Sequence, residues 1–496
     1  YFIQDEGTKV ILMYLESMER GREFVETAKS SDKPIILYKA NVTGSGASRA
    51  MSHTSALAND DEILDAAVRQ AGVIRVKTLD QLIQFPAAFL LPEMKGDNIS
   101  IISPAGGFTV LAADHAEEHG FKFPMLSEET QSALKQYIRA GVIQLGNPID
   151  LGDALSTDAQ LMAIDKTLEQ PEIDGSIYMT SRRQASNYKG PLRAMLRNPI
   201  PELAELALKH RKPVVSAFVG APELVKEYRG DTKLPVYNSP ELAIRALAAF
   251  RDFCHFKRTR VLDEKKPAAP KKALALLDAQ PAGLITGNTA FEIIESAGIK
   301  TVSTVIARSA AEAAAISSRM GFPVVMKIDC PGISHKTESG GVRLGLDSSS
   351  KVKAAYADMA ALLKKNKLIG NIVIQKMAGP GVEVILGARR DPSFGQVLMF
   401  GMGGIFVEAL RDVVFRLAPV TPEEAAKMID SVRAGSILKG LRGFPPSDKK
   451  ALIDAIVSLG RMIAFCPRIV EMDINPLIVL PKGSGCLSVD ARIVLD

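Results

Sequence analysis

The sequence contains few of the residues that carry several common kinds of chemistry. Among its 496 residues there are four cysteines, six histidines and no tryptophan, and aromatic residues make up only 6%. The four cysteines are far apart and form no CxxC pair, which argues against both a disulfide framework and a zinc site. This cysteine usage fits a reducing cytosol, so we expect a cytoplasmic protein.

Long apolar runs and basic tracts are also missing. No run approaches the roughly 18 apolar residues of a membrane span, and the first residues lack the charged-then-apolar order of a signal peptide. Lys and Arg number 61 against 56 Asp and Glu, a net charge of +5, and no basic stretch is interleaved with aromatic residues. We therefore expect neither a membrane nor a nucleic acid as a partner, and acidic small molecules at most.

The first half of the chain has the pattern of an α/β protein. Short apolar runs alternate there with segments of helical periodicity, at Val10–Leu15, Pro34–Ala40, Val73–Val76, Asn98–Ser103, Ser176–Thr180 and Pro213–Gly220. This alternation is typical of βαβ units and parallel sheets. Turn residues just before Asn98 predict a boundary between two such sheets near residue 97.

The second half follows a charged, proline-containing stretch at residues 263–272, which we interpret as an extended linker. Beyond it, helical stretches flank apparent strands at Val324–Ile328, Ile372–Met377, Glu383–Arg390, Gln396–Phe400, Leu477–Leu480 and Leu487–Leu495. This mixture indicates an α+β domain. With 47% hydrophobic and 24% charged residues, the whole chain has an ordinary globular composition and predicts two to four domains.

Two histidines stand in loops whose composition sets them apart from the other four. His53 lies in a stretch of small residues, and His335 lies in a glycine-containing loop after the apparent strand that carries Lys327. Glycine-rich turns that follow a strand expose backbone N–H groups to phosphate. On spacing alone a plain loop histidine stays the commoner role for both, and we interpret the other four histidines as packing or surface residues.

Five motifs, spread over nearly the whole chain, carry a family resemblance. They are Ser52-His53-Thr54 with Ala56-Leu57-Ala58, Asn147-Pro148-Ile149-Asp150-Leu151, His335-Lys336 with Gly340-Gly341-Val342, residues 400–408, and Asp473-Ile474-Asn475-Pro476-Leu477. In this order they resemble the NDP-forming acyl-CoA synthetases, relatives of succinyl-CoA synthetase. The resemblance implies two flavodoxin-like parallel-sheet domains, residues 1–96 and 97–262, and an α+β ATP-grasp domain at residues 273–496 after the linker.

The reaction implied by the resemblance joins an acid, CoA and ATP to give acyl-CoA, ADP and phosphate. It runs through an acyl phosphate and a phosphohistidine, because a neutral imidazole can accept a phosphoryl group covalently. By the resemblance His53 is that phosphohistidine and Glu16 is its partner carboxylate. Asp473 would orient the histidine when it visits a second site, and His335 is a possible second phosphoryl carrier.

The resemblance also implies the residues that bind phosphate, nucleotide and Mg²⁺. The strand and turn before Gly106-Gly107 predict a helix start, which offers free N–H groups to an anion. Without the family, a structural glycine turn would be the commoner interpretation there, and the other residues would be ordinary strand-end, turn or surface residues. The implied ligands are Gly106 and Gly107 for phosphate, Lys327, Gln375, Met377 and Glu383 for ATP, and Asn475 and Asp490, on two apparent strands, for Mg²⁺.

The chain departs from the family pattern at three points. The family usually has Gly in place of Ser55 and Gly-Ser in place of Asn59-Asp60, which concerns loop flexibility rather than the nucleophile. The family's N-terminal CoA-binding domain would precede Tyr1, so we expect a fragment whose CoA site lies largely in a preceding domain or a partner subunit. The resemblance further implies a homodimer.

Two other functions compete with the synthetase. One is a ligand-sensing regulatory module of a protein acetyltransferase, because some relatives are fused to such enzymes. The presence of both His53 and His335 argues against it. The other is an ATP-grasp carboxylate-amine ligase, which would leave the His53 loop without a nucleophile's task.

Overall fold

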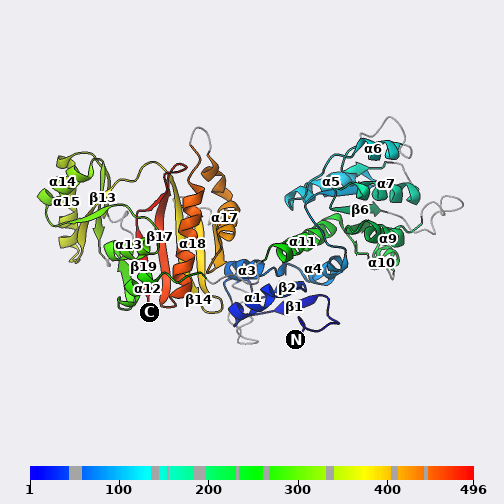
Figure 1. The fold of residues 1–496 in the computed structure, drawn as a ribbon, viewed down its shortest axis with the longest axis horizontal. Coiled ribbons are helices and arrows are strands. Elements are labelled where there is room, and N and C mark those ends of the chain that lie inside the picture. Colours follow the sequence, from blue (N-terminus) through cyan, green and yellow to red (C-terminus); the bar gives the residue numbers. More distant parts are fainter. Residues whose placement is uncertain are drawn as a thin grey trace. The chain divides into compact units, whose positions relative to one another are not determined.

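The computed structural model describes residues 1–43, 59–135, 145–152, 156–181, 197–230, 234–260, 267–330, 340–403, 412–440 and 445–496 (Figure 1). His53 and His335 lie outside these ranges. The described chain forms two compact units. Unit 1 falls within Tyr1–Met18, Glu23–Ala58 and Val68–Asp263, and unit 2 within Glu19–Arg22, Asn59–Ala67 and Glu264–Asp496.

Unit 1 contains two parallel sheets. The first has the order β1-β2-β3, formed by β1 (Ile11–Leu15), β2 (Ile35–Lys39) and β3 (Ile74–Val76). The second has the order β5-β4-β6-β7-β8, formed by β4 (Ile99–Ser103), β5 (Ile149–Asp150), β6 (Gly175–Ser181), β7 (Val214–Val219) and β8 (Val236–Tyr237). Counted from β4, the second order is 2-1-3-4-5, which is that of flavodoxin-like folds.

Helices cover these sheets, and one of them joins the two cores. They are α1 (Gly21–Lys29), α3 (Asp61–Gln70), α4 (Leu79–Gln84), the 3₁₀ helix η1 (Phe85–Leu90), α5 (Gly106–Glu118), α6 (Glu128–Lys135), α7 (Thr157–Glu169), α9 (Ile200–His210), α10 (Pro222–Arg229) and α11 (Pro240–Thr259). The first two residues of α1 and residues 61–67 of α3 belong to unit 2. α11 is capped by the Ser239 hydroxyl, which accepts from the Leu242 N–H. Its buried face packs in one cluster with Ile36 of the first sheet and Ile177 of the second. The two sheets of unit 1 therefore share a core.

Unit 2 contains two antiparallel sheets. The larger has the order β16-β15-β14-β17-β19-β9, with β18 paired to β17; its strands are β9 (Gly283–Thr286), β14 (Val382–Asp391), β15 (Gly395–Met402), β16 (Val413–Leu417), β17 (Ile469–Val479), β18 (Cys486–Ser488) and β19 (Ala491–Leu495). The smaller has the order β10-β13-β11-β12, with β10 (Thr304–Ala307), β11 (Val324–Asp329), β12 (Val342–Leu346) and β13 (Asn371–Lys376).

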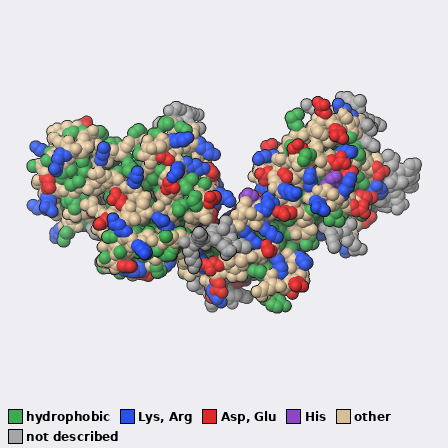
Figure 2. Space-filling view, viewed as in Figure 1, with side chains coloured by type: hydrophobic (Ala, Val, Ile, Leu, Met, Phe, Trp, Pro, Cys, Tyr) green, Lys and Arg blue, Asp and Glu red, His purple; other side chains and the backbone are tan. Residues whose placement is uncertain are grey.

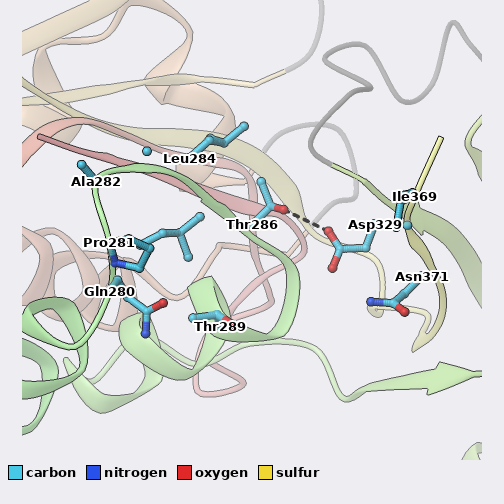
Figure 3. Close-up of a pocket in the computed structure, with 12 residues that line it drawn as sticks. Gln280, Pro281, Ala282, Leu284, Thr286, Thr289, Asp329, Ile369 and Asn371 are labelled. Atoms are coloured by element: carbon cyan, nitrogen blue, oxygen red, sulfur yellow. Dashed lines mark hydrogen bonds between the residues drawn. The ribbon is translucent and has the colours of Figure 1, made fainter.

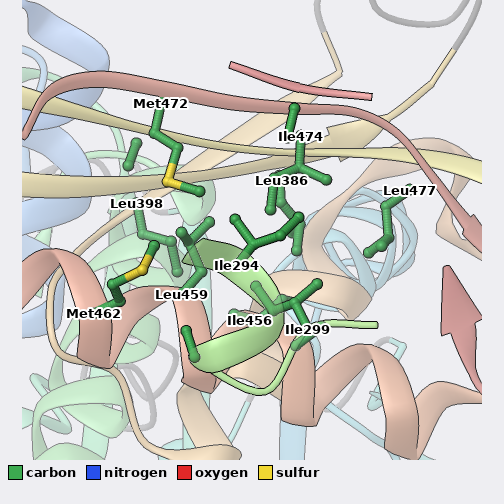
Figure 4. Packing of buried hydrophobic residues seen from close by; sticks show 14 of the residues in the cluster. Ile294, Ile299, Leu386, Leu398, Ile456, Leu459, Met462, Met472, Ile474 and Leu477 are labelled. Atoms are coloured by element: carbon green, nitrogen blue, oxygen red, sulfur yellow. The ribbon is translucent and has the colours of Figure 1, made fainter. Parts of the chain in front are cut away.

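The helices of unit 2 bury apolar faces against these sheets. They are α12 (Lys271–Asp278), α13 (Gly287–Ser296), α14 (Ala310–Met320), α15 (Ser349–Lys365), α17 (Pro422–Ser431), the 3₁₀ helix η3 (Arg433–Lys439) and α18 (Lys449–Phe465). Figure 4 shows Ile294 of α13 and Leu459 of α18 packed against Leu386 of the larger sheet, and all three are fully buried. Burial of such a side chain stabilises the fold by about 1.5–3 kcal/mol.

Most of the expected strands are present, with two corrections. The run Leu487–Leu495 was expected to be one strand, but it forms β18 and β19, and Asp490 lies in the break between them. The linker was expected to be extended throughout, but Lys271 and Lys272 begin α12, because Pro270 at the cap position is compatible with a helix start.

The surface and the cysteines agree with the composition. Lys and Arg side chains are interspersed with Asp and Glu on the face that Figure 2 shows. All four cysteines are free and buried. Among the described helices, none is both long and apolar enough to cross a bilayer.

Candidate active site

Glu16 lies at the carboxyl end of the first sheet, directly after β1. A buried lysine that the sequence analysis did not single out lies beside it. Lys39, at the end of β2, is only 5% exposed and donates a hydrogen bond of 2.7 Å from Nζ to the Glu16 carbonyl, and others to the Ala40 and Asn41 carbonyls. The lysine therefore joins the ends of β1 and β2 where the chain enters the segment that contains His53.

Gly106 and Gly107 begin α5, as predicted. Ala105, which precedes them, makes no side-chain cap hydrogen bond, so the helix start presents its N–H groups without one. At Gly106 a Cβ atom would lie 2.3 Å from Oδ2 of Asp150, whereas at Gly107 it would have no neighbour within 4 Å among the described residues. Asp150 lies beside Gly106 because strand register pairs it with Ser103, at the end of β4. A larger residue at position 106 would therefore have to displace this carboxylate.

Lys327 and Gln375 converge on one backbone carbonyl. Nζ of Lys327 on β11 donates to the Val489 oxygen at 2.8 Å, and Nε2 of Gln375 on β13 donates to the same oxygen at 3.4 Å and to Oγ1 of Thr304 at 3.2 Å. Both residues are less than a tenth exposed, and Oε1 of Gln375 is buried and accepts no hydrogen bond from any residue that the structure describes. Two side chains of the smaller sheet thus hold the turn of the larger sheet that carries Asp490.

Asn475 and Asp490 lie opposite one another through the register of β17. This strand pairs Leu477 with Ser488 of β18 and Ile474 with Ala491 of β19, so Asn475 lies opposite the break that contains Asp490. On its other side, β14 pairs Val384 with Leu477 and then Leu386 with Ile474, so β17 carries one extra residue, a β-bulge, at the same point. Amide and carboxylate oxygens fit Mg²⁺, although no group of three His, Cys, Asp or Glu side chains suited to a metal ion occurs among the described residues.

Asp473 is the neighbouring acidic group on β17. Burial raises its pKa to about 6, the Arg492 guanidinium lowers it, and the Asp490 carboxylate adds a smaller upward effect. Arg492 lies opposite Asp473 on β19 and also pairs with the Glu471 carboxylate. Asp473 therefore lies on the same strand as Asn475, two residues before it, and pairs across to the strand that follows Asp490.

Met377 and Glu383 border the same region. Met377 follows β13 directly and is 42% exposed, as expected for an apolar side chain that covers a flat ligand. Glu383 is exposed on β14, opposite Ile478 of β17, and its carbonyl accepts from the Gly403 N–H at 2.8 Å. A Cβ at position 403 would lie 2.9 Å from the Glu383 backbone, so the first glycine of the Gly403-Gly404 pair is required by packing.

A cavity of about 400 Å³ lies elsewhere in unit 2 (Figure 3). It is lined by Gln280–Thr286, Thr289, Asp329 and Ile369–Asn371, and by none of the predicted site residues. The Thr286 hydroxyl donates to Oδ1 of Asp329 at 3.1 Å, and a Cβ at Gly287 would meet Oδ2 of the same carboxylate at 1.9 Å. Asp329 therefore fixes the start of α13, which is a structural role, and the cavity shares no lining residue with the predicted site, although Asp329 lies on the same strand as Lys327.

Comparison with known proteins gives the same assignment as the motifs. Residues 1–89 match the succinyl-CoA ligase-like flavodoxin domain, and residues 277–495 match an ATP-grasp domain. A solved structure described as the dinucleotide forming acetyl-coenzyme A synthetase 1 of Ca. Korarchaeum cryptofilum, in complex with coenzyme A and Ca-AMPCP, is 41% identical over 45% of this chain and 97% of that chain, with a TM-score of 0.42.

Two curated relatives align along almost the entire chain. The ADP-forming 4-hydroxybutyrate–CoA ligase of Nitrosopumilus maritimus is 33% identical over 98% of this chain and 70% of the relative. The ADP-forming acetate–CoA ligase I of Archaeoglobus fulgidus is 33% identical over 100% of this chain and 71% of the relative. The expected family and the expected fold class are confirmed. The chain belongs to the ADP-forming acyl-CoA ligases, acid–thiol ligases that combine succinyl-CoA ligase-like and ATP-grasp domains.

Proposed function

We propose that this chain performs the family's reaction with His53 as the phosphoryl carrier. The nucleotide binds where Lys327 and Gln375 meet the turn that carries Asp490. In the first half-reaction, an imidazole nitrogen of His53 attacks the γ-phosphorus of ATP, a P–N bond forms, the bond to the bridging oxygen breaks and ADP leaves. In the second, the acid's carboxylate takes the phosphoryl group to give acyl phosphate. The CoA thiolate then displaces phosphate. The convergence of Lys327 and Gln375 beside Asp490 is the observation that carries this proposal.

The roles of the chain's own residues follow from their positions. Lys327 supplies a positive charge for the phosphates of ATP, and the Gln375–Ala378 segment with Met377 contacts the base. Asn475 and Asp490 would hold Mg²⁺, which when bound supplies charge neutralisation for phosphates. Asp473 orients the incoming imidazole, and Glu383 contacts the nucleotide.

At the acyl site, Glu16 holds the other ring nitrogen of His53 and so fixes its tautomer. The start of α5 at Gly106 and Gly107 binds the phosphate, because its N–H groups and helix dipole favour an anion. CoA binding in a preceding domain or a partner subunit, the homodimer, the cytoplasmic location and the domain limits 1–96, 97–262 and 273–496 remain predictions. Neither the regulatory module nor the amine ligase gains support from the relatives, whose names are those of CoA ligases.

The experiment is to incubate the full-length protein with γ-labelled ATP and Mg²⁺ and to map acid-labile, base-stable label. We expect label on His53, its loss in His53→Ala, and normal labelling in the control His255→Ala, which removes an exposed histidine of α11. Label that persists in His53→Ala would refute the assignment. Acetate and 4-hydroxybutyrate, named for the two relatives, begin the panel of acids for the second half-reaction.

His335 has two possible roles that the same assay separates. If it is a covalent relay, His335→Asn abolishes exchange between ATP and ADP but leaves labelling of His53 from acyl-CoA and phosphate intact. If it only positions the γ-phosphate, exchange slows by roughly 10²- to 10³-fold. Exchange at the normal rate would exclude both roles.

A further inference from the structure

Two short segments from the N-terminal third of the chain belong to unit 2. They are Glu19–Arg22 and Asn59–Ala67, and the second directly follows the segment 44–58 that contains His53. Both contact the turn between β14 and β15. That turn is built locally, because Oδ1 of Asp391 accepts the N–H groups of Ser393 at 2.8 Å and of Phe394 at 2.9 Å. The contacts within unit 2 therefore join a preformed turn to the residues beside the predicted phosphoryl carrier.

The contacts with the second segment are polar. Nδ2 of Asn59 donates to Oγ of Ser393 at 3.0 Å, and the Asp60 carboxylate accepts from the Arg389 guanidinium. Asp60 also begins α3, since its Oδ1 accepts the Glu62 N–H at 3.1 Å. These are the two positions at which the family usually has Gly-Ser, which offers neither an amide side chain nor a charge.

The contact with the first segment is close-packed. The Arg22 N–H donates to the Ser393 carbonyl at 3.0 Å. Phe394 is fully buried, and a Cβ at Gly21 would lie 2.4 Å from its Cε1 atom. The ring thus occupies the space that only a glycine at position 21 leaves open.

We propose that Asn59 and Asp60 are positioning residues that anchor the C-terminal end of the segment 44–58 to the Ser393 turn and the Arg389 side chain of the ATP-grasp unit. This inference rests on the proposed role of His53. His53 and Asn59 are only six positions apart in the sequence, so even a fully extended chain keeps residue 53 within roughly 20 Å of the anchor. A short tether of this kind raises the effective concentration of the carrier near the nucleotide site. Phosphoryl transfer from ATP to His53 should depend on the anchor, whereas phosphorylation of His53 from acyl-CoA and phosphate should not.

The test compares two labelling reactions of His53 in the full-length protein, one from γ-labelled ATP and one from acyl-CoA with labelled phosphate. Asp60→Asn removes the charge but keeps an oxygen that can cap α3. We expect Asp60→Asn and Arg389→Gln each to slow single-turnover labelling from ATP by about two- to five-fold, the range of an exposed ion pair. The double variant should be no slower than the slower single variant, because both changes remove the same interaction. Glu62→Gln, which removes an exposed charge from the same first turn of α3, should leave both rates unchanged.

A second variant probes the buried part of the anchor. Gly21→Ala should displace Phe394 and slow labelling from ATP by about tenfold, since overpacking of a core contact is costly. The matched control is Gly7→Ala, whose Cβ would meet only an ordinary contact of 3.5 Å with Asp5. Unfolding temperatures of all variants show whether each one folds.

The outcomes separate the anchor from the proposed function. Selective slowing of the ATP reaction with an unchanged acyl reaction supports the anchor. Equal slowing of both reactions, or no slowing in any folded variant, overturns it. If wild-type His53 takes label from neither donor, the proposed function itself fails, and the anchor has no carrier to position.

Discussion

Replacing Lys327 by methionine should disable the nucleotide half of the reaction and leave the fold intact. Lys327 is 8% exposed and its ammonium donates to the Val489 carbonyl, which in the variant keeps a weaker donor at 3.4 Å in Gln375. A hydrogen bond from a charged group contributes about 1.5–3 kcal/mol, and methionine recovers part of this through apolar burial. We therefore expect a loss of roughly 1 kcal/mol in the free energy of unfolding.

The kinetic effect of Lys327→Met should be larger than its effect on stability. Loss of one preorganised charge contact to a transferring phosphoryl group lowers the rate by about 10²- to 10³-fold. The assay is single-turnover labelling of His53 from ATP, with labelling from acyl-CoA and phosphate as the internal control. The matched variant is Lys376→Met, which removes an exposed lysine next to Gln375 on β13. Normal labelling from ATP in a folded Lys327→Met protein would refute the placement of the nucleotide site.

Three further predictions follow from single residues. Asp490→Asn should raise the Mg²⁺ concentration needed for half-maximal labelling from ATP, and an unchanged requirement would remove Asp490 from the metal site. Asp448 accepts three backbone N–H groups, at 3.1, 3.0 and 2.9 Å, which lower its pKa. The stability that the Asp448 carboxylate contributes to the fold is therefore fully present above its ordinary pKa near 4. This contribution is lost as the pH falls through the lowered pKa of the folded state. Asp448→Ala should cost about 1–2 kcal/mol in urea unfolding at pH 7 and less at pH 3, whereas an equal cost at both would contradict this account. Gly106→Ala should slow labelling from acyl-CoA and phosphate by displacing Asp150, while Gly107→Ala, at an open position, should not; equal effects would argue against the α5 site.

The strands that the sequence predicted are those that propensity and burial determine locally. β2 and β7 are short, almost entirely buried β-rich runs, and both were expected within one or two residues of their observed ends. β12 was not expected, because its sequence VRLGL has no continuous apolar run and includes a glycine with φ of +65°. The break between β18 and β19 was missed for a different reason. It is held by Lys327, Gln375 and the bond from the Val489 N–H to the Pro476 carbonyl, all of them distant in sequence.

The candidate site likewise combines residues that the sequence indicates and residues whose role depends on distant neighbours. Asn475, Asp490, Lys327 and Gln375 were predicted through the resemblance. Strand register places Asn475 opposite Asp490, and hydrogen bonds to the Val489 carbonyl join Lys327 and Gln375 to the same turn. Lys39 was not selected and Asp150 was noted only as part of a family motif, because a lysine or an aspartate that ends a strand gains meaning only from neighbours on other elements. Asn59 and Asp60 were noticed only as a departure from the family, since their partners on the β14–β15 hairpin lie more than 300 positions further along the chain.

The most direct test of the central claim is a chase of the isolated phosphoprotein. Full-length protein labelled from ATP is freed of nucleotide and then divided between ADP and a mixture of acid and CoA. We expect ADP to take the labelled phosphoryl group and form labelled ATP. We expect the acid with CoA to transfer the label to inorganic phosphate, with acyl-CoA formed in equal amount. Label that stays on the protein under both conditions, while the enzyme turns over normally, would show that the phosphohistidine is not an intermediate and would contradict the account.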